Sequence, residues 1–81
     1  MSDQEAREKI KAAFYEAYRQ QGLYAIVTAE EVVAPLNLGE QQARRCFEYL
    51  GAKGLIKRMT LDGGYSPTVA LVDEVEKGVG A

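Results

Sequence analysis

The chain has 81 residues and a formal net charge of −2, which fits one small domain and by itself argues mildly against a nucleic-acid partner. It has no histidine and a single cysteine, so the commonest general base and metal ligand is absent and no internal disulfide can form. No apolar stretch approaches the roughly 20 residues of a membrane helix, and the acidic N-terminus is unlike a secretory signal. We therefore expect a single cytoplasmic domain over residues 1–81 that is not an enzyme, does not enter a membrane, and binds no metal or other cofactor.

The first helix is predicted from a capping box at the N-terminus. The Ser2 hydroxyl is placed to accept from the backbone amide of Glu5, three residues later. We expect a helix over about residues 3–21, because Gly22 then offers a C-terminal cap with a positive φ. One face of this helix carries apolar residues at helical spacing: Ala6, Ile10, Phe14, Ala17 and Tyr18.

A short strand and a second capping box follow. Residues 23–27 are apolar without helical periodicity, which indicates an edge strand. Thr28 and Glu31 form the second capping box and predict a helix that begins at Ala29. This helix must be short, because Pro35 lacks a backbone N–H and crowds the preceding turn.

A tight turn is predicted before the third helix. Asn37 tolerates the left-handed conformation that such a turn requires, and Gly39 is a suitable N-cap for a helix that begins at Glu40. Gly54 is the expected residue after the helix end. The inward face of this helix is predicted to consist of Ala43, Cys46, Phe47 and Leu50, so Cys46 is expected to pack in the core rather than act in redox chemistry.

A hairpin follows the third helix. Asp62 and Gly63 are the strongest short hairpin signal in the sequence, and they predict a two-residue type I′ turn. The turn would join a strand within residues 55–61 to a second strand at residues 64–66.

A final helix is predicted from Ser66 and Pro67, which are typical of an N-cap and a first helical position. Its apolar face is predicted to consist of Val69, Val72 and Val75, and Gly78 is expected to end it. The apolar residues of this helix span a wider arc than one core contact needs: Val69, Ala70, Leu71, Val72 and Val75. This surplus favours a homodimer through the terminal helices, and the alternative is that Leu71 simply covers the core.

Charge is unevenly distributed along the chain. Five basic but only two acidic side chains lie between Gly39 and Thr60, whereas the remaining residues carry five basic and ten acidic ones. A basic segment within an acidic chain is typical of a nucleic-acid-binding surface. Its cations are Arg44, Arg45, Lys53, Lys57 and Arg58.

The predicted order of helix, short strand, helix, tight turn, helix, hairpin and helix resembles the winged helix-turn-helix superfamily. Four segments carry the resemblance: residues 28–38 are similar to the first helix and turn of the helix-turn-helix, residues 42–50 to the recognition helix, residues 53–58 (KGLIKR) to the entry of the wing, and residues 68–76 to the closing helix. The resemblance covers nearly the whole chain. It implies a mainly α-helical α+β fold with a three-helix core, a β-hairpin wing and a fourth helix, and it is more specific for fold than for function.

The resemblance implies a transcription regulator, dimeric on a two-fold related site, that reads double-stranded DNA with its third helix. The side chains expected to reach base edges in the major groove are those of Gln41, Gln42, Arg44 and Arg45. The side chains expected to hold phosphates are those of Thr28, Lys57 and Arg58.

Two alternatives accompany this interpretation. Arg44 and Arg45 could form a solvated helix face, paired with Glu40, Glu48 or Gln41 at four-residue spacing. The whole chain could instead be a protein–protein interaction module, a subunit or adaptor that does not bind DNA. That alternative is favoured by the net negative charge, by Pro35 within the first helix of the helix-turn-helix, and by a hairpin tip without a basic residue. A continuous positive face would favour DNA, and its interruption by acidic side chains would favour a protein partner.

Overall fold

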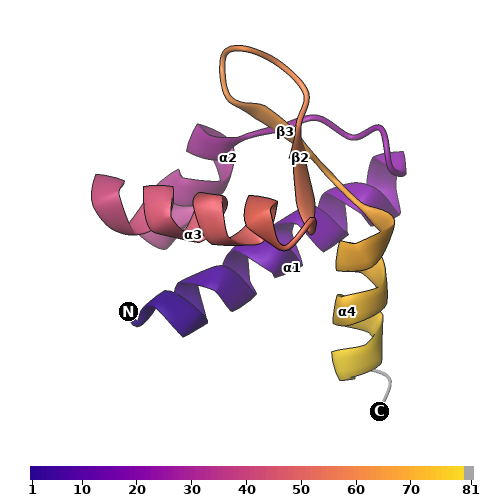
Figure 1. Cartoon of the computed structure of the whole chain (residues 1–81), viewed down its shortest axis with the longest axis horizontal. Helices are drawn as coiled ribbons and strands as arrows, with labels where there is room; N and C mark the ends of the chain where they lie inside the picture. The colour runs from indigo at the N-terminus through magenta and orange to yellow at the C-terminus, as the bar shows by residue number, and fades with distance from the viewer. Residues whose placement is uncertain (80–81) are drawn as a thin grey trace.

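Helices and strands follow one another in the predicted order (Figure 1). The structure is a computed structural model and describes residues 1–79. Its elements are α1 (Asp3–Gln21), β1 (Val27–Thr28), α2 (Ala29–Val33), the 3-10 turn η1 (Ala34–Leu36), α3 (Glu40–Ala52), β2 (Ile56–Arg58), β3 (Gly64–Pro67) and α4 (Val69–Val79). The described residues therefore form a mainly α-helical α+β fold, with four α-helices and a small three-stranded antiparallel sheet.

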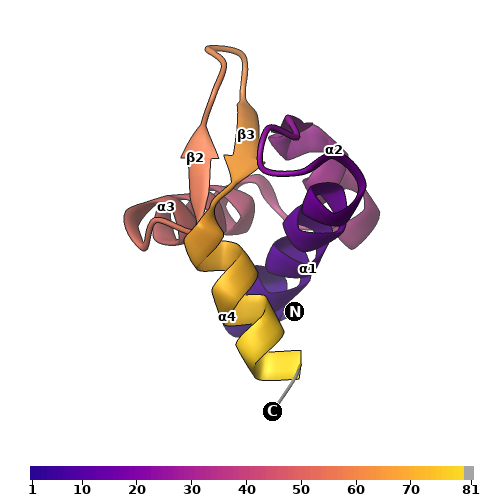
Figure 2. The same cartoon turned by 90° about the vertical axis from the view of Figure 1, so that its right-hand side faces the viewer.

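The sheet joins the hairpin to the segment before α2. β3 lies in the middle, and β1 and β2 pair with it on either side. Tyr65 is opposite Val27 on one side and opposite Arg58 on the other. Figure 2 shows β2 and β3 side by side, with their connecting loop projecting beyond the helices.

Residues 23–26 lie outside any strand, so the prediction of a strand over residues 23–27 is wrong for all but its last residue. The backbone N–H of Ala25 donates a hydrogen bond to the carbonyl oxygen of Gly22 at 3.2 Å. The carbonyl oxygen of Ala25 accepts from the buried hydroxyl of Ser66 in β3. The segment is therefore attached to the sheet by a side chain, and only Val27–Thr28 completes a backbone ladder.

Both predicted capping boxes begin helices. Ser2 Oγ accepts from the backbone N–H of Glu5 at 3.1 Å, and α1 starts at the next residue after Ser2. Thr28 Oγ1 accepts from the backbone N–H of Glu31 at 3.2 Å and begins α2. Each hydroxyl satisfies a donor that the first turn of a helix leaves unpaired.

The turn between α2 and α3 follows from Pro35 and Asn37. α2 lasts five residues and tightens into η1, which contains Pro35. Asn37 then adopts the left-handed conformation, with φ 56° and ψ 37°, and Gly39 is the N-cap of α3. The predicted turn and the start of the third helix are confirmed.

The C-terminus of α3 is closed by Gly54, which has a φ of +76°. Its backbone N–H donates to the carbonyl oxygen of Gly51 at 3.0 Å, and the N–H of Leu55 donates to that of Leu50 at 2.9 Å. These are the two hydrogen bonds of a Schellman motif, which needs a residue that tolerates positive φ. The prediction of Gly54 as the residue after the helix end is therefore confirmed.

The hairpin loop is wider than predicted. A type I′ turn needs positive φ at both central residues, but of the predicted pair only Gly63 has it, at 92°, and Asp62 does not. The loop instead spans Met59–Gly63, closed by a bond from the N–H of Met59 to the carbonyl oxygen of Gly64 at 2.8 Å. Thr60 Oγ1 accepts from the N–H of Gly64, also at 2.8 Å. This side-chain hydrogen bond closes the loop in place of the backbone hydrogen bond of a two-residue turn.

The start and end of α4 also differ from prediction. Pro67 ends β3, where it is opposite Ile56, so it is not the first residue of the helix. Thr68 is the residue whose hydroxyl accepts from the N–H of Leu71, at 3.3 Å. Gly78 lies inside the helix, because an isolated glycine weakens a helix by only about 1 kcal/mol.

The buried face of α4 differs from the predicted valine face. Leu71 and Val72 are buried and Val75 is partly buried, whereas Val69 is 58% exposed. A helix has 3.6 residues per turn, so residues six positions apart, such as Val69 and Val75, point about 120° apart around its axis. They therefore cannot both point into the core. Leu71 is therefore part of the core, as the alternative expected, and the homodimer stays a prediction.

Two polar contacts hold α4 against α1. Lys11 Nζ lies 2.9 Å from the carboxylate of Glu74, and the hydroxyl of Tyr15 donates to Glu76 at 2.9 Å. Lys11 also pairs with Glu8 on its own helix, at 2.9 Å. Figure 2 shows α4 leading away from the end of β3.

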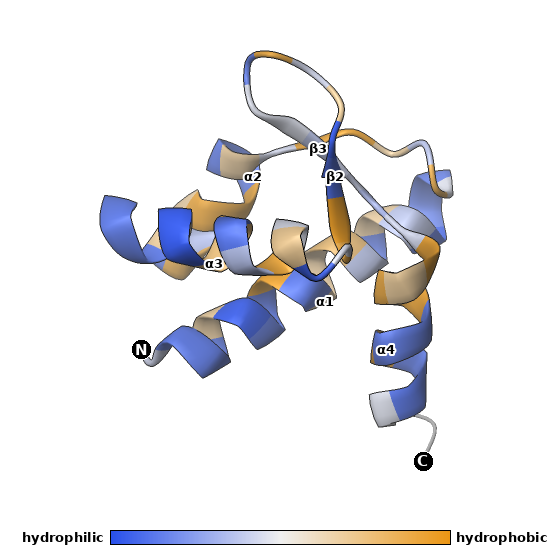
Figure 3. Cartoon of the chain, in the orientation of Figure 1, coloured by the Kyte–Doolittle hydropathy of each residue, from blue (hydrophilic) through white to orange (hydrophobic). Residues whose placement is uncertain are grey.

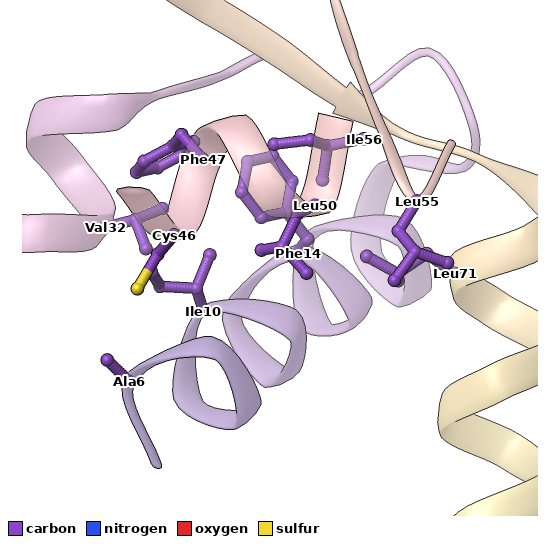
Figure 4. Close-up of a cluster of buried hydrophobic side chains, with 10 residues drawn as sticks. All are labelled: Ala6, Ile10, Phe14, Val32, Cys46, Phe47, Leu50, Leu55, Ile56 and Leu71. Carbon is purple, nitrogen blue, oxygen red and sulfur yellow. The ribbon is translucent and has the colours of Figure 1, made fainter. Parts of the chain in front are cut away.

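The core lies between α1, α3, the sheet and the start of α4 (Figure 4). The rings of Phe14 and Phe47 meet edge to face, with their centres 6.2 Å apart. The ring centres of Phe47 and Tyr65 lie 5.1 Å apart. Cys46 is fully buried, as predicted.

Colouring by hydropathy shows hydrophilic residues along α3 and a change from hydrophobic to hydrophilic along β2 (Figure 3). Among residues 1–79, no helix is both long and apolar enough to cross a membrane.

Candidate functional site

A groove between α2, α3 and the hairpin gathers three of the predicted basic residues. Arg44 lines it from α3, and Lys57 and Arg58 line it from β2. Its floor is largely apolar and includes Phe47, Ile56 and Tyr65, which belong to the core or pack against it. The short connection through Gly54 places the end of α3 next to the start of β2, so cations 13 and 14 residues apart in sequence line one surface.

Two glutamates interrupt the positive charge of this groove. Glu40 and Glu48 lie one helical turn before and after Arg44 and also line the groove. Arg44 Nη2 lies 3.8 Å from Glu40 Oε1, with both side chains highly exposed, so the pair is weak. Three cations against two carboxylates leave a small positive excess rather than a continuous positive face, which is the arrangement expected to favour a protein partner.

Arg58 is held along the hairpin loop. Its Nε donates to the carbonyl oxygen of Thr60 at 3.2 Å, and its Nη2 donates to that of Leu61 at 2.9 Å. Both acceptors are backbone carbonyl oxygens, so these contacts place no carboxylate beside the guanidinium. Leu61 itself is 94% exposed at the loop tip.

The side chains of Arg45 and Gln42 reach the first turn of α1 at the protein surface. Arg45 donates from Nε and Nη2 to the two carboxylate oxygens of Asp3, at 3.0 and 3.1 Å. Gln42 Nε2 donates to Asp3 at 3.1 Å and to the carbonyl oxygen of Met1 at 2.7 Å. The hydrogen bonds from Arg45, and then from Gln42, lower the pKa of Asp3 to about 2.

The remaining two predicted residues have separate positions. The hydroxyl of Thr28 caps α2, as described above, and its backbone is part of β1. Gln41 is exposed in the first turn of α3. The structure therefore brings Arg44, Lys57 and Arg58 together and pairs Gln42 with Arg45 at a different place.

A second basic cluster was not predicted from the sequence. The guanidinium carbon of Arg7 lies 4.0 Å from the ring centre of Tyr49, and Lys53 Nζ lies 5.5 Å from it. Arg45 and Tyr49 of α3 and Lys53, the residue that caps it, recur every four residues, a pattern that the sequence does contain. Arg7 comes from α1, and no local pattern indicates that it packs on this face.

The cysteine shows no sign of reactivity. Burial is the main cause that raises the pKa of the Cys46 thiol, so the thiol stays protonated at neutral pH.

In the part of the chain that the structure describes, no group of three or more His, Cys, Asp or Glu side chains is arranged to hold a metal ion.

Comparison of the chain with models of protein families, with curated proteins and with solved structures gives no match in any of the three. A functional proposal therefore depends on the residues and geometry of this chain.

Proposed function

We propose that the protein is a winged-helix DNA-binding protein, most simply a transcription regulator, with α3 as its recognition helix and the β2–β3 hairpin as its wing. The element order supports this proposal, as does the sheet order β1-β3-β2, in which the segment before α2 pairs with the hairpin. The short α2, the left-handed Asn37 and the following α3 have the arrangement expected of a helix-turn-helix.

The observation that carries the proposal is the groove in which Arg44, Lys57 and Arg58 lie together. Clustered cations produce a field that scattered ones do not, and each phosphate contact adds affinity by releasing counterions. Lys57 and Arg58, with the hydroxyl of Thr28, are proposed to hold phosphates. Arg44 and the exposed Gln41 are proposed to face base edges, where Arg pairs with guanine and Gln with adenine.

The test is a titration of a fluorescently labelled duplex with the full chain, followed by anisotropy at several salt concentrations. Arg44→Ala and Lys57→Ala should each weaken binding by about three- to tenfold at about 0.1 M salt. Lys77→Ala is the matched control, because Lys77 is an exposed cation in the last turn of α4 and should change affinity by less than about twofold. Equal effects of all three substitutions would contradict a role for the groove.

A protein-interaction module is the second candidate. Glu40 and Glu48 in the groove favour it, and so does a hairpin tip that presents the highly exposed Leu61 next to Asp62 without a basic residue. The protein would then recover a stoichiometric partner from nuclease-treated extract of its native cells, and Leu61→Asp would abolish that recovery. Recovery of no partner, or of the same partner by Leu61→Asp, would remove this candidate.

A homodimer through the terminal helices is retained as part of the DNA-binding proposal, with a narrower contact surface. Val69 and Ala70 are the exposed apolar side chains near the start of α4 that a second copy would cover. Sedimentation equilibrium should then show a dimer in the wild type and a monomer in Val69→Asp. A monomeric wild type at high concentration would rule the dimer out.

A further inference from the structure

The side chains of Arg45 and Gln42 form a fork of hydrogen-bond donors on α3. Three donor atoms, Arg45 Nε, Arg45 Nη2 and Gln42 Nε2, converge on the carboxylate of Asp3 at 3.0 to 3.1 Å. The side chain of Arg45 is 57% exposed and that of Asp3 is 38% exposed, so the fork lies at the surface. It is an anion-binding site whose anion belongs to the chain itself.

A phosphodiester group presents the same two oxygens that this carboxylate presents. The planar guanidinium of Arg binds carboxylate and phosphate with the same bidentate geometry. The fork sits on α3, the proposed recognition helix, and Arg45 projects about 100° around the helix from Arg44, so the fork lies beside the groove rather than in it. Asp3 belongs to the first turn of α1. Two residues earlier, the carbonyl oxygen of Met1 accepts a hydrogen bond from the side chain of Gln42.

We propose that Arg45 and Gln42 form a phosphate-binding site that Asp3 occupies in the free protein, so that a DNA phosphate must displace the Asp3 carboxylate to use it. This inference rests on the proposed DNA-binding function. Gln42 and Arg45 then contact the sugar–phosphate backbone rather than base edges, in contrast to the sequence-based expectation. Asp3 acts as an internal competitor that lowers affinity for any duplex, whatever its sequence.

The first test compares the salt dependence of duplex binding in the wild type, Asp3→Ala and Glu5→Ala. Glu5 is the matched control, because it carries the same charge in the same turn of α1 and does not contact Arg45. In Asp3→Ala the freed site should steepen the slope of log K against log salt by about one and raise affinity by about five- to tenfold at about 0.1 M salt. Adding Arg45→Ala to Asp3→Ala should remove both effects.

A second test needs no DNA and uses inorganic phosphate as the probe. Phosphate titrated into Asp3→Ala should shift the NMR signal of the Arg45 Nε–H group saturably, and the same titration should leave that signal unchanged in the wild type and in Glu5→Ala. Circular dichroism of each variant establishes that it is folded before the comparison is made.

The outcomes separate this inference from the proposed function. If no variant binds a duplex but the Arg45 signal responds to phosphate in Asp3→Ala, the anion site stands and the DNA-binding function fails. If duplexes bind but Asp3→Ala and Glu5→Ala have equal slopes, Asp3 does not compete with DNA and the inference is wrong. An unresponsive Arg45 signal in a folded Asp3→Ala would overturn the inference in either case.

Discussion

The guanidinium of Arg58 donates a hydrogen bond to the carbonyl oxygen of Leu61, at 2.9 Å, and a second to that of Thr60, at 3.2 Å. One side chain at the end of β2 thus fixes the backbone of the loop that follows it. The same residue lines the groove, so the shape of the hairpin tip and the charge of the candidate DNA-binding surface depend on a single guanidinium.

Arg58→Lys separates these two roles. Lysine keeps the positive charge but cannot supply the planar pair of donors, so the loop loses about one hydrogen bond, worth roughly 1 kcal/mol. We expect hydrogen exchange of the Gly64 amide, which is bonded to Thr60 Oγ1, to become about fivefold faster, while duplex affinity changes by less than about threefold. Lys57→Arg is the control, and an unchanged exchange rate in Arg58→Lys would show that the loop is held by other contacts.

Gly51 and Gly54, three residues apart at the end of α3, should respond oppositely to alanine. A Cβ at either position meets no atom within 4 Å, so only the backbone decides the outcome. Gly51 has helical geometry, and Gly51→Ala should stabilise the fold by about 0.5–1 kcal/mol. Gly54 has a φ of +76°, and Gly54→Ala should destabilise it by about 1–2 kcal/mol. Urea unfolding followed by circular dichroism measures both, and two changes of the same sign would contradict the cap described here.

Leu71 and Val69 test which face of α4 packs against the rest of the molecule. Leu71 is fully buried, so Leu71→Ala should lower the free energy of unfolding by about 2–5 kcal/mol. Val69 is 58% exposed, so Val69→Ala should change it by less than about 0.5 kcal/mol in the monomer. A larger cost at Val69 than at Leu71, measured at low protein concentration, would place the buried face where the sequence had predicted it.

The Asp3–Arg45 pair makes stability depend on pH in the acid range. The folded-state pKa of Asp3 is about 2, below its ordinary value of 3.8, so its stabilising contribution is complete above about pH 5 and is lost as pH falls through 3.8 and then through 2. The difference in unfolding free energy between the wild type and Asp3→Ala should therefore shrink from about pH 5 to about pH 2. Denaturant unfolding at several pH values gives this difference. A constant difference would mean that the carboxylate is not held by charge.

Much of the fold was predictable because its signals are local. The Ser2 and Thr28 hydroxyls, the left-handed Asn37 and the closing Gly54 each act within a few residues of their own position. Such features depend on backbone geometry that one residue type satisfies best, and therefore the sequence contains them directly.

The errors arose where a distant partner decides the local structure. Ser66 matches a helix cap by sequence, but its hydroxyl donates to Ala25, 41 residues away, and Thr68 caps α4 instead. The Asp62-Gly63 pair matches a tight turn, but the hydroxyl of Thr60 and the guanidinium of Arg58 stabilise a longer loop.

The candidate site was predictable in composition but not in arrangement. Helical spacing correctly placed Arg44 on the exposed face of α3. It could not separate Arg44 from its neighbour Arg45, because the pairing of Arg45 with Asp3 spans 42 residues and joins two helices. For the same reason the contact of Arg7 with the ring of Tyr49 had no sequence signal.

The most direct test of DNA binding is the slope of log K against log salt for the wild-type protein and a short duplex between about 50 and 200 mM salt. With Arg44, Lys57 and Arg58 contacting phosphates or bases from one groove, the slope should be about −2 to −3. A flat dependence, or no binding at about 50 mM salt, would contradict the proposal that this groove binds DNA.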